Sequence, residues 1–195
     1  ALTVEANTAL STFIEKGLVK DVDDEQFERQ FNMLIAELKA KGYDHYEFSN
    51  HGKLGYFSQN NIGYWTGKPY IGIGPAAHSF SGDIRSWNVS NNIKYIKSIE
   101  SGKRPSESEK LFKVDQYNEY VMTRLRTKWG IDIDEVEEKF GKNYTDLLIK
   151  ETAHLIDEDL VRTDKNKIYI TEKGKFLSDG IASKLFMLNL NQESY

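Results

Sequence analysis

The sequence predicts an α/β part over residues 1–105, followed by a mainly α part over residues 106–195. Three observations support this fold class: strand and helix patterns alternate near the N-terminus, a glycine- and aromatic-rich segment follows, and three helical patterns then precede a pair of strands. A chain of 195 residues with 39% hydrophobic and 29% charged residues has the composition of one large or two small globular domains.

The first part has the order strand, helices, strand. Residues 2–4 have the pattern of a strand end. A short helix running to Gly17 and a longer one running to Gly42 follow, and residues 43–49 alternate as a strand does. This order is typical of a βα barrel or a doubly wound sheet. The expected helix caps are Asn7 or Thr8 for the first helix and Asp23 or Asp24 for the second, whose apolar residues at helical spacing predict a buried stripe (Phe27, Phe31, Leu34, Ile35 and Leu38).

Residues 49–83 differ from their surroundings because they are dense in glycine and aromatic side chains. Glycine permits positive φ angles, and long loop-rich stretches in compact domains are usually functional, so we expect a functional loop here. A strand over residues 84–89 and a helix ending at Gly102 follow. The expected boundary between the two parts lies at residues 103–106.

The second part has the order of a winged-helix unit. We expect a helix over about residues 115–128, a short helix capped by Asp132 or Asp134, and a third helix over residues 144–156. A hairpin over residues 160–171 and a final helix complete the unit. A winged helix suggests DNA binding, but the third helix carries more acids than bases, and acids facing phosphates would cost energy.

Composition excludes several kinds of site. The net charge is −4, and residues 1–105 are neutral overall, so neither part predicts a nucleic-acid partner. The chain contains no cysteine, and its four histidines show no metal-ligand spacing, so we expect no metal site and no catalytic residue. No apolar run is long enough for a membrane span, and the start lacks the pattern of a signal peptide, so a cytoplasmic location is expected.

Four candidate sites lie in or beside the glycine-rich segment, each with a functional and a structural interpretation. Gly72-x-Gly74 either lets a ligand approach the backbone or forms a tight turn. Asn60, Asn61, Tyr64 and Trp65 either bind and stack on a flat ligand, or belong to a loop whose amides satisfy its own backbone. His78 is a base, a ligand contact or a hydrogen-bonded structural histidine, and Glu47 with Asn50 either lines a barrel mouth or is structural.

Consecutive motifs in this segment resemble those of the HemW-type relatives of the oxygen-independent coproporphyrinogen III oxidase, a radical-SAM family. The resemblance runs through Tyr46-Glu47-Phe48-Ser49-Asn50, Asn61-x-x-Tyr64-Trp65, Tyr70-x-Gly72-x-Gly74-Pro75-x-Ala77-His78 and Arg85-x-Trp87-Asn88. It continues through Leu125-Arg126-x-x-x-Gly130, Leu155-Ile156-x-x-x-Leu160-Val161 and Thr171-x-x-Gly174. The motifs keep their order, and they cover essentially the whole chain.

The resemblance implies the C-terminal part of a partial βα (TIM-like) radical-SAM barrel over residues 1–105, followed by a winged-helix-like domain over residues 106–195. It implies a parent that holds a [4Fe–4S] cluster and S-adenosylmethionine, with Gly74, Ala77 and His78 near the latter. The family's tetrapyrrole motif is His-Asn-x-x-Tyr-Trp, but here Asn60 replaces the histidine before Asn61, Tyr64 and Trp65. An amide is a poor ligand for heme iron, so axial heme ligation at this motif is disfavoured, and His51 or His78 could substitute.

These features predict a fragment of a heme-chaperone-type protein of heme metabolism, with heme or coproporphyrinogen as its tetrapyrrole partner. The missing N-terminal barrel portion is the second expected partner. Because the cluster-binding cysteines are absent, we expect the fragment to be incompetent for radical chemistry and to hold no cofactor firmly. The alternatives are a true coproporphyrinogen III oxidase, a winged-helix DNA-binding regulator and a stand-alone heme-binding protein.

Overall fold

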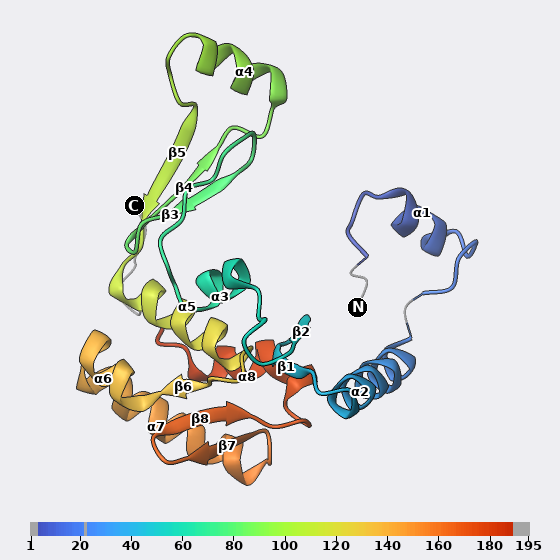
Figure 1. Cartoon of the computed structure of the whole chain (residues 1–195), viewed down its shortest axis with the longest axis vertical. Coiled ribbons are helices and arrows are strands. Elements are labelled where there is room, and N and C mark those ends of the chain that lie inside the picture. Colours follow the sequence, from blue (N-terminus) through green and yellow to red (C-terminus); the bar gives the residue numbers. More distant parts are fainter. Residues whose placement is uncertain (1–3, 22, 189–195) are drawn as a thin grey trace. The chain divides into compact units, whose positions relative to one another are not determined.

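The computed structural model describes residues 4–21 and 23–188, and Figure 1 shows its elements. The chain divides into two compact units, Ala1–His45 and Tyr46–Tyr195. Each unit is described here by itself.

The first unit contains two helices whose caps were predicted from the sequence. Helix α1 (Ala9–Glu15) begins where the Thr8 hydroxyl accepts the N–H of Ser11, and α2 (Asp24–Ala40) begins where the Asp23 carboxylate accepts the N–H of Gln26. These caps satisfy N–H groups that have no partner inside a helix. The strand expected at residues 2–4 lies mostly outside the described residues, and Val4 belongs to no element.

The buried stripe predicted for α2 is wrong for this structure. No residue of α2 is buried, and the Leu34 side chain is exposed. The stripe does have local order, because the rings of Phe27 and Phe31 lie 5.9 Å apart. A unit of two helices has too little apolar surface to cover such a stripe.

The second unit begins with a small sheet, a short helix and a larger sheet. Strands β1 (Asp44–Glu47) and β2 (Asn50–Gly52) pair with each other, and α3 (Gln59–Trp65) follows. Strands β3 (His78–Phe80), β4 (Ile84–Asn88) and β5 (Ser106–Lys110) form an antiparallel sheet in the order β3–β4–β5. Helix α4 (Asn92–Glu100) connects β4 to β5 and lies at the far end of this sheet from α5 in Figure 1.

Two expectations for this region need correction. The stretch of residues 49–83 is not one loop, because β2, α3 and β3 lie within it. Helix α3 starts where the Ser58 hydroxyl accepts the N–H of Asn61, so the Asn-Asn motif occupies a helical turn. Strand β5 starts at Ser106, within the expected boundary at residues 103–106. A division into two domains at that point stays a prediction.

The remaining elements follow the predicted order of three helices and a hairpin. They are α5 (Lys113–Leu125), β6 (Ile131–Asp132), α6 (Ile133–Phe140), α7 (Lys142–Asp157), β7 (Val161–Asp164), β8 (Lys167–Ile170), the 3-10 turn η1 (Lys175–Leu177) and α8 (Ser178–Leu185). Strand β6, which the sequence did not predict, pairs with β8 and completes the antiparallel sheet β6–β8–β7. The Asp132 carboxylate caps α6, as expected.

The hydrophobic core of the second unit lies among these C-terminal elements. Helix α5 buries one stripe, α7 contributes Leu148 and Leu155, and β8 contributes Ile168. The Tyr117 ring is fully buried, and its hydroxyl donates to the carbonyl of Leu185, which ties α5 to α8. The stripe of α5 consists of Tyr117, Val121 and Leu125.

No helix in the described part of the chain is both long and apolar enough to cross a bilayer.

Candidate functional site

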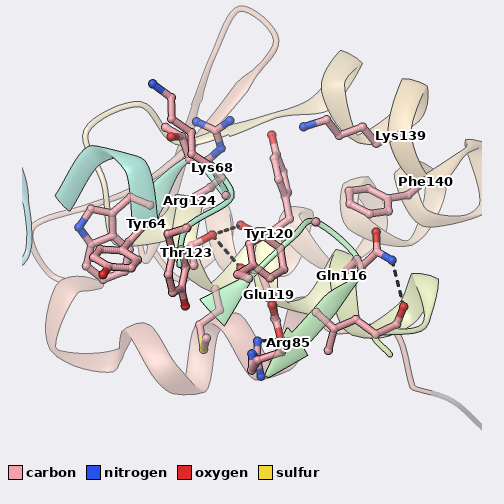
Figure 2. Close-up of a pocket in the computed structure, with 18 residues that line it drawn as sticks. Tyr64, Lys68, Arg85, Gln116, Glu119, Tyr120, Thr123, Arg124, Lys139 and Phe140 are labelled. Atoms are coloured by element: carbon pink, nitrogen blue, oxygen red, sulfur yellow. Dashed lines mark hydrogen bonds and ion pairs between the residues drawn. The ribbon is translucent and has the colours of Figure 1, made fainter. Parts of the chain in front are cut away.

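A pocket of about 640 Å³ lies in the second unit between α3, the β3–β4 strands, α5 and the end of α6. Its volume falls within the range of roughly 300–1,000 Å³ typical of small-molecule sites. Figure 2 shows Tyr64 and Lys68 on one side of the pocket and Lys139 with Phe140 on the other.

Aromatic rings form much of the pocket wall. The Tyr64 ring meets Tyr70 edge-on, with centroids 4.7 Å apart, and Tyr70 lies 6.2 Å from Phe80. Across the pocket, the rings of Tyr120 and Phe140 lie 5.8 Å apart. Rings of this kind provide apolar surface for a flat partner while keeping polar groups at their tips.

One cation of the wall is held by acidic partners. The Arg85 guanidinium, on β4, pairs with the carboxylates of Glu109 on β5 and Glu119 on α5. Burial alone would lower the pKa of Arg85, but the contact with Glu119 raises it above the usual value. These pairs join the β3–β4–β5 sheet to α5 and therefore fix one side of the pocket.

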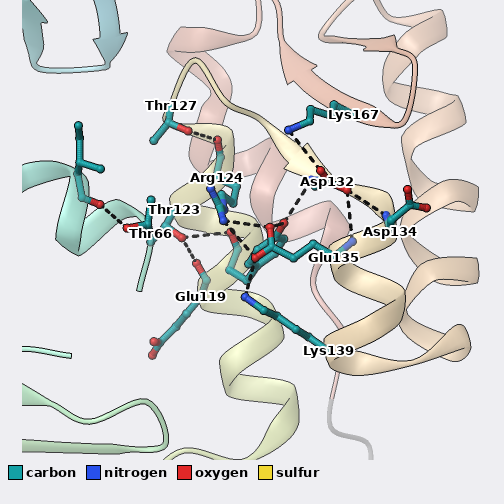
Figure 3. Close-up of polar contacts among 12 residues, drawn as sticks. Thr66, Glu119, Thr123, Arg124, Thr127, Asp132, Asp134, Glu135, Lys139 and Lys167 are labelled. Carbon is teal, nitrogen blue, oxygen red and sulfur yellow. Dashed lines mark hydrogen bonds and ion pairs between the residues drawn. The ribbon is translucent and has the colours of Figure 1, made fainter. Parts of the chain in front are cut away.

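Two other cations of the wall, Arg124 and Lys139, converge on the carboxylate of Glu135, as Figure 3 shows. The Arg124 guanidinium donates to both Glu135 oxygens at 3.2 and 3.0 Å, and the Lys139 ammonium lies 2.6 Å from Oε1. The Tyr120 hydroxyl donates to Oε2 at 2.8 Å. Burial opposes ionisation of Glu135, but the hydrogen bonds from Lys139 and Tyr120 and the charge of Arg124 hold its pKa below the ordinary value.

The Tyr120 hydroxyl stays protonated within this cluster. Burial raises the pKa of Tyr120 far above its usual range, and the hydrogen bond to Glu135 raises it further. The hydroxyl also accepts the N–H of Asp132 at 3.2 Å, so it both donates and accepts. The Tyr120 ring is therefore fixed beside the pocket.

The Gly72-x-Gly74 segment is held by side chains of the β3–β4–β5 sheet. The buried Asn88 amide donates to the carbonyls of Gly74 at 2.9 Å and Gly72 at 3.3 Å, and its oxygen accepts from Arg104 at 3.0 Å. The Gly74 N–H donates to the Tyr95 hydroxyl at 3.2 Å. A Cβ on Gly72 would lie 2.1 Å from the carbonyl oxygen of His78, so close packing within the chain requires this glycine.

At Gly74 the backbone conformation, and not close packing, favours glycine. Its φ angle is +105°, a conformation that L side chains rarely adopt, while the space beside its Cα is open. The structure thus supports the tight-turn reading of the motif, and contact of Gly74 with S-adenosylmethionine stays a prediction.

The structure separates the predicted site residues into two groups. Tyr64 and Trp65 line the pocket, whereas Asn60, Asn61, Gly74, Ala77 and His78 are not part of its wall. Asn60 and Asn61 occupy the first turn of α3, and Asn60 is exposed. His78 is exposed on β3, where its ring lies 6.2 Å from that of Trp87.

The residues present do not fit a cysteine-ligated cluster. The sequence contains no cysteine, and the described residues include no group of three or more histidine, aspartate or glutamate side chains placed to hold a metal ion. Glu47 is buried, but its carboxylate accepts the N–H of Ser49 at 3.0 Å and a hydrogen bond from the Asn50 side chain. The Glu47–Asn50 pair therefore stabilises the turn between β1 and β2.

Sequence reasoning missed the polar part of the wall, which α5, α6 and the segment after α3 form. The missed residues are Lys68, Gln116, Glu119, Tyr120, Thr123, Arg124 and Lys139. One signal was available: those on α5 recur every three or four positions, on the helix face beside the stripe of Tyr117, Val121 and Leu125. A polar stripe of that kind does not reveal which element lies across from it.

Comparison with known proteins gives consistent matches. Residues 113–177 match the family model of the HemN C-terminal domain. The chain is 30% identical to a protein named heme chaperone HemW from Lactococcus lactis, over 98% of this chain and 50% of that protein. It is 28% identical to a protein of the same name from Bacillus subtilis, over 93% of this chain and 48% of that protein.

A solved structure matches as well. The Escherichia coli coproporphyrinogen III oxidase HemN, described as a radical SAM enzyme, superimposes with a TM-score of 0.62 and 19% identity, over 80% of this chain and 40% of that one. At that identity the match shows a shared fold. The chain spans about half the length of the curated relatives it matches. The resemblance to the HemW-type, coproporphyrinogen III oxidase-like family is thereby confirmed, and this chain corresponds to the C-terminal portion of its members.

Proposed function

We propose that this chain is the tetrapyrrole-handling, C-terminal portion of a HemW-type heme chaperone, with heme as its cargo. The observation that carries the proposal is the alignment of 98% of the chain with a protein named heme chaperone HemW. The missing N-terminal barrel portion is its expected partner, and a cytoplasmic location stays a prediction.

We further propose the finer fold assignment that the resemblance implies. The order α5–β6–α6–α7–β7–β8, with β6 completing the β6–β8–β7 sheet, supports a winged-helix-like domain over residues 106–195. Residues 1–105 would then belong to the end of a radical-SAM barrel with its glycine- and aromatic-rich extension.

The radical-SAM cofactors would be held mainly by residues outside this sequence. A [4Fe–4S] cluster needs cysteine ligands, and this chain has none to offer. Gly74, Ala77 and His78 are the residues proposed to lie near S-adenosylmethionine. The open space beside the Cα of Gly74 supports that placement.

Heme ligation at the position of Asn60 is disfavoured, so another side chain has to supply the imidazole. His78 is exposed, whereas His51 is partly buried and burial lowers its pKa against the opposing charge of Glu47. An exposed ring on a strand is the more accessible ligand. We therefore propose His78 as the axial ligand of the cargo heme.

A heme titration of the full chain, followed at the Soret band, tests this function. We expect a saturable spectral shift that His78→Ala weakens strongly and His51→Ala leaves nearly unchanged. His154→Ala is the matched control, because His154 is also exposed and lies on α7. Absence of a saturable shift at micromolar heme would reject the chaperone function for this chain.

Two alternatives have less support. The shared fold with coproporphyrinogen III oxidase is compatible with a parent protein that decarboxylates coproporphyrinogen. A match at 19% identity does not show that the two proteins share an activity. A DNA-binding regulator would present α7 to phosphates, yet Lys142 and Lys150 of that helix pair with Asp146 and Glu151. A salt-dependent DNA shift at low ionic strength would revive that alternative.

A further inference from the structure

We propose that the pocket between α3 and α5 is a binding site for a flat aromatic ligand that carries two carboxylates along one edge. The identification of this ligand as a tetrapyrrole with propionate side chains rests on the proposed function. The site residues follow from the pocket itself.

The shape and lining of the pocket suit a planar ligand. Its volume of about 640 Å³ is bounded by Tyr64, Tyr70 and Phe80 on the side of α3 and the sheet, and by Tyr120 and Phe140 on the side of α5 and α6. Tyr64 is 47% exposed, so part of its ring remains accessible to a ligand beside its edge-on contact with Tyr70. Rings facing each other across an open space are suited to a planar partner with π-faces of its own.

One side of the pocket carries an excess of positive charge. Arg124 and Lys139 share the single carboxylate of Glu135, which leaves one positive charge uncompensated in that cluster. The Lys68 ammonium has no hydrogen-bond or ion-pair partner among the residues the structure describes. Lys68 and the Glu135 cluster together carry two uncompensated positive charges, which favours two anionic groups on that side of the pocket. The cluster of Arg85 with Glu109 and Glu119 carries one net negative charge.

The uncompensated positive charges lie along one edge of the pocket. In Figure 2 the side chains of Lys68, Arg124 and Lys139 extend along the upper edge of the pocket, whereas Arg85 lies at the lower edge. Arg85 is already paired with Glu109 and Glu119. Free positive charge is therefore confined to one edge, so the two carboxylates of the ligand would lie on its corresponding edge.

The pocket adjoins the sheet face that carries His78. Alternate residues of a strand share a face, so His78 and Phe80 lie on the same side of β3. The register places Arg85 opposite Phe80 and Trp87 opposite His78. Because Phe80 and Arg85 line the pocket, this face continues from the pocket wall toward the proposed axial ligand.

Metal-free protoporphyrin IX tests the pocket independently of any iron ligand. We would titrate it into the full chain and follow quenching of tryptophan emission, since Trp65 lines the pocket. The double substitution Lys68→Gln and Lys139→Gln should raise the Kd by about tenfold, because two charge-assisted contacts at a partly exposed rim are lost. Lys94→Gln on the exposed surface of α4 is the control, and it should leave the Kd unchanged.

The porphyrin dimethyl ester provides the matched ligand control. It lacks the carboxylates, so its Kd should not differ between the wild type and the double variant. Equal affinity of all proteins for protoporphyrin IX would overturn the pocket assignment, and the chaperone function would still stand if heme bound through His78. Heme binding that depends on His78, with no binding of the metal-free porphyrin, would also overturn the pocket assignment. Failure of both titrations would reject the proposed function together with the pocket.

Discussion

At the scale of single residues, Asn88 explains why the glycine motif keeps its shape. Its amide is 2% exposed, donates to the carbonyls of Gly72 and Gly74, and accepts from Arg104. Buried carbonyls that lose their donors cost roughly 1–3 kcal/mol each, so this one side chain stabilises the turn. Contacts within the chain therefore explain the shape of the Gly72-x-Gly74 motif, which the sequence offered as a ligand contact. The open side of Gly74 leaves room for a ligand.

Glu135 gives a residue-scale prediction about pH. Its pKa in the folded state lies below the ordinary value of 4.5, so its contribution to stability is fully present above that pH and is lost as the pH falls through the folded pKa. Glu135→Gln should lower the free energy of unfolding by about 1–2 kcal/mol at pH 7, because Arg124, Lys139 and Tyr120 lose a charged acceptor. Urea unfolding at pH 7 and at about pH 4 measures the difference.

The difference between wild type and variant should shrink below pH 4.5, where Glu135 of the unfolded chain takes up a proton while the folded carboxyl stays ionised. Glu138→Gln, an exposed change on the same helix, should show no comparable loss. A penalty for Glu135→Gln that is the same at both pH values would contradict the role assigned to its charge.

At the scale of elements, Gly130 brings α5 close to the β6–β8–β7 sheet. Its φ angle is +66°, and a Cβ there would lie 2.4 Å from the carbonyl oxygen of Ile168 and 2.9 Å from the Tyr169 ring. Gly130→Ala should therefore destabilise the protein by about 3 kcal/mol or more, from backbone strain and overpacking together. Gly102→Ala separates the two causes, because its φ angle is +77° but no atom lies within 4 Å of the added Cβ.

The Gly102→Ala variant should lose only about 1 kcal/mol, the cost of the left-handed conformation alone. Urea unfolding of both variants, followed by tryptophan fluorescence, compares them directly. Similar losses in the two variants would show that close approach to β8 contributes nothing at Gly130.

Elements with local signals could be predicted, and elements defined by their partners could not. Thr8, Asp23 and Asp132 cap the helices that they were expected to cap. Strand β5 was missed because all five of its side chains are exposed and it has no apolar face, and only its pairing with β4 defines it. Helix α3 was missed although Ser58 is a suitable cap, because Gly63 and the surrounding glycines are typical of a loop.

At the scale of the whole molecule, the same limit applies to the candidate site. Tyr64 and Trp65 were singled out from the sequence and do line the pocket, but Lys139 is more than 70 positions away. Which residues of α5 and α6 face α3 depends on long-range packing that no local pattern encodes. The family resemblance identified only residues within the recognised motifs. It therefore located the pocket wall at α3 and not the wall at α5 and α6.

The distribution of the core leads to a prediction about the whole chain. The core cluster runs from Tyr117 to Leu185, and neither α1 nor α2 contains a buried residue. Since burial of apolar surface is the main favourable contribution to folding, residues 44–195 should fold without the preceding segment. Deletion of residues 1–43 should leave a cooperative thermal transition within a few degrees of the full chain, followed by near-ultraviolet circular dichroism.

Deletion of residues 178–195 is the control, and it should abolish the transition because Ile181 and Leu185 leave the core. Loss of cooperativity on removing residues 1–43 would mean that the first unit supplies stability that its exposed helices do not reveal.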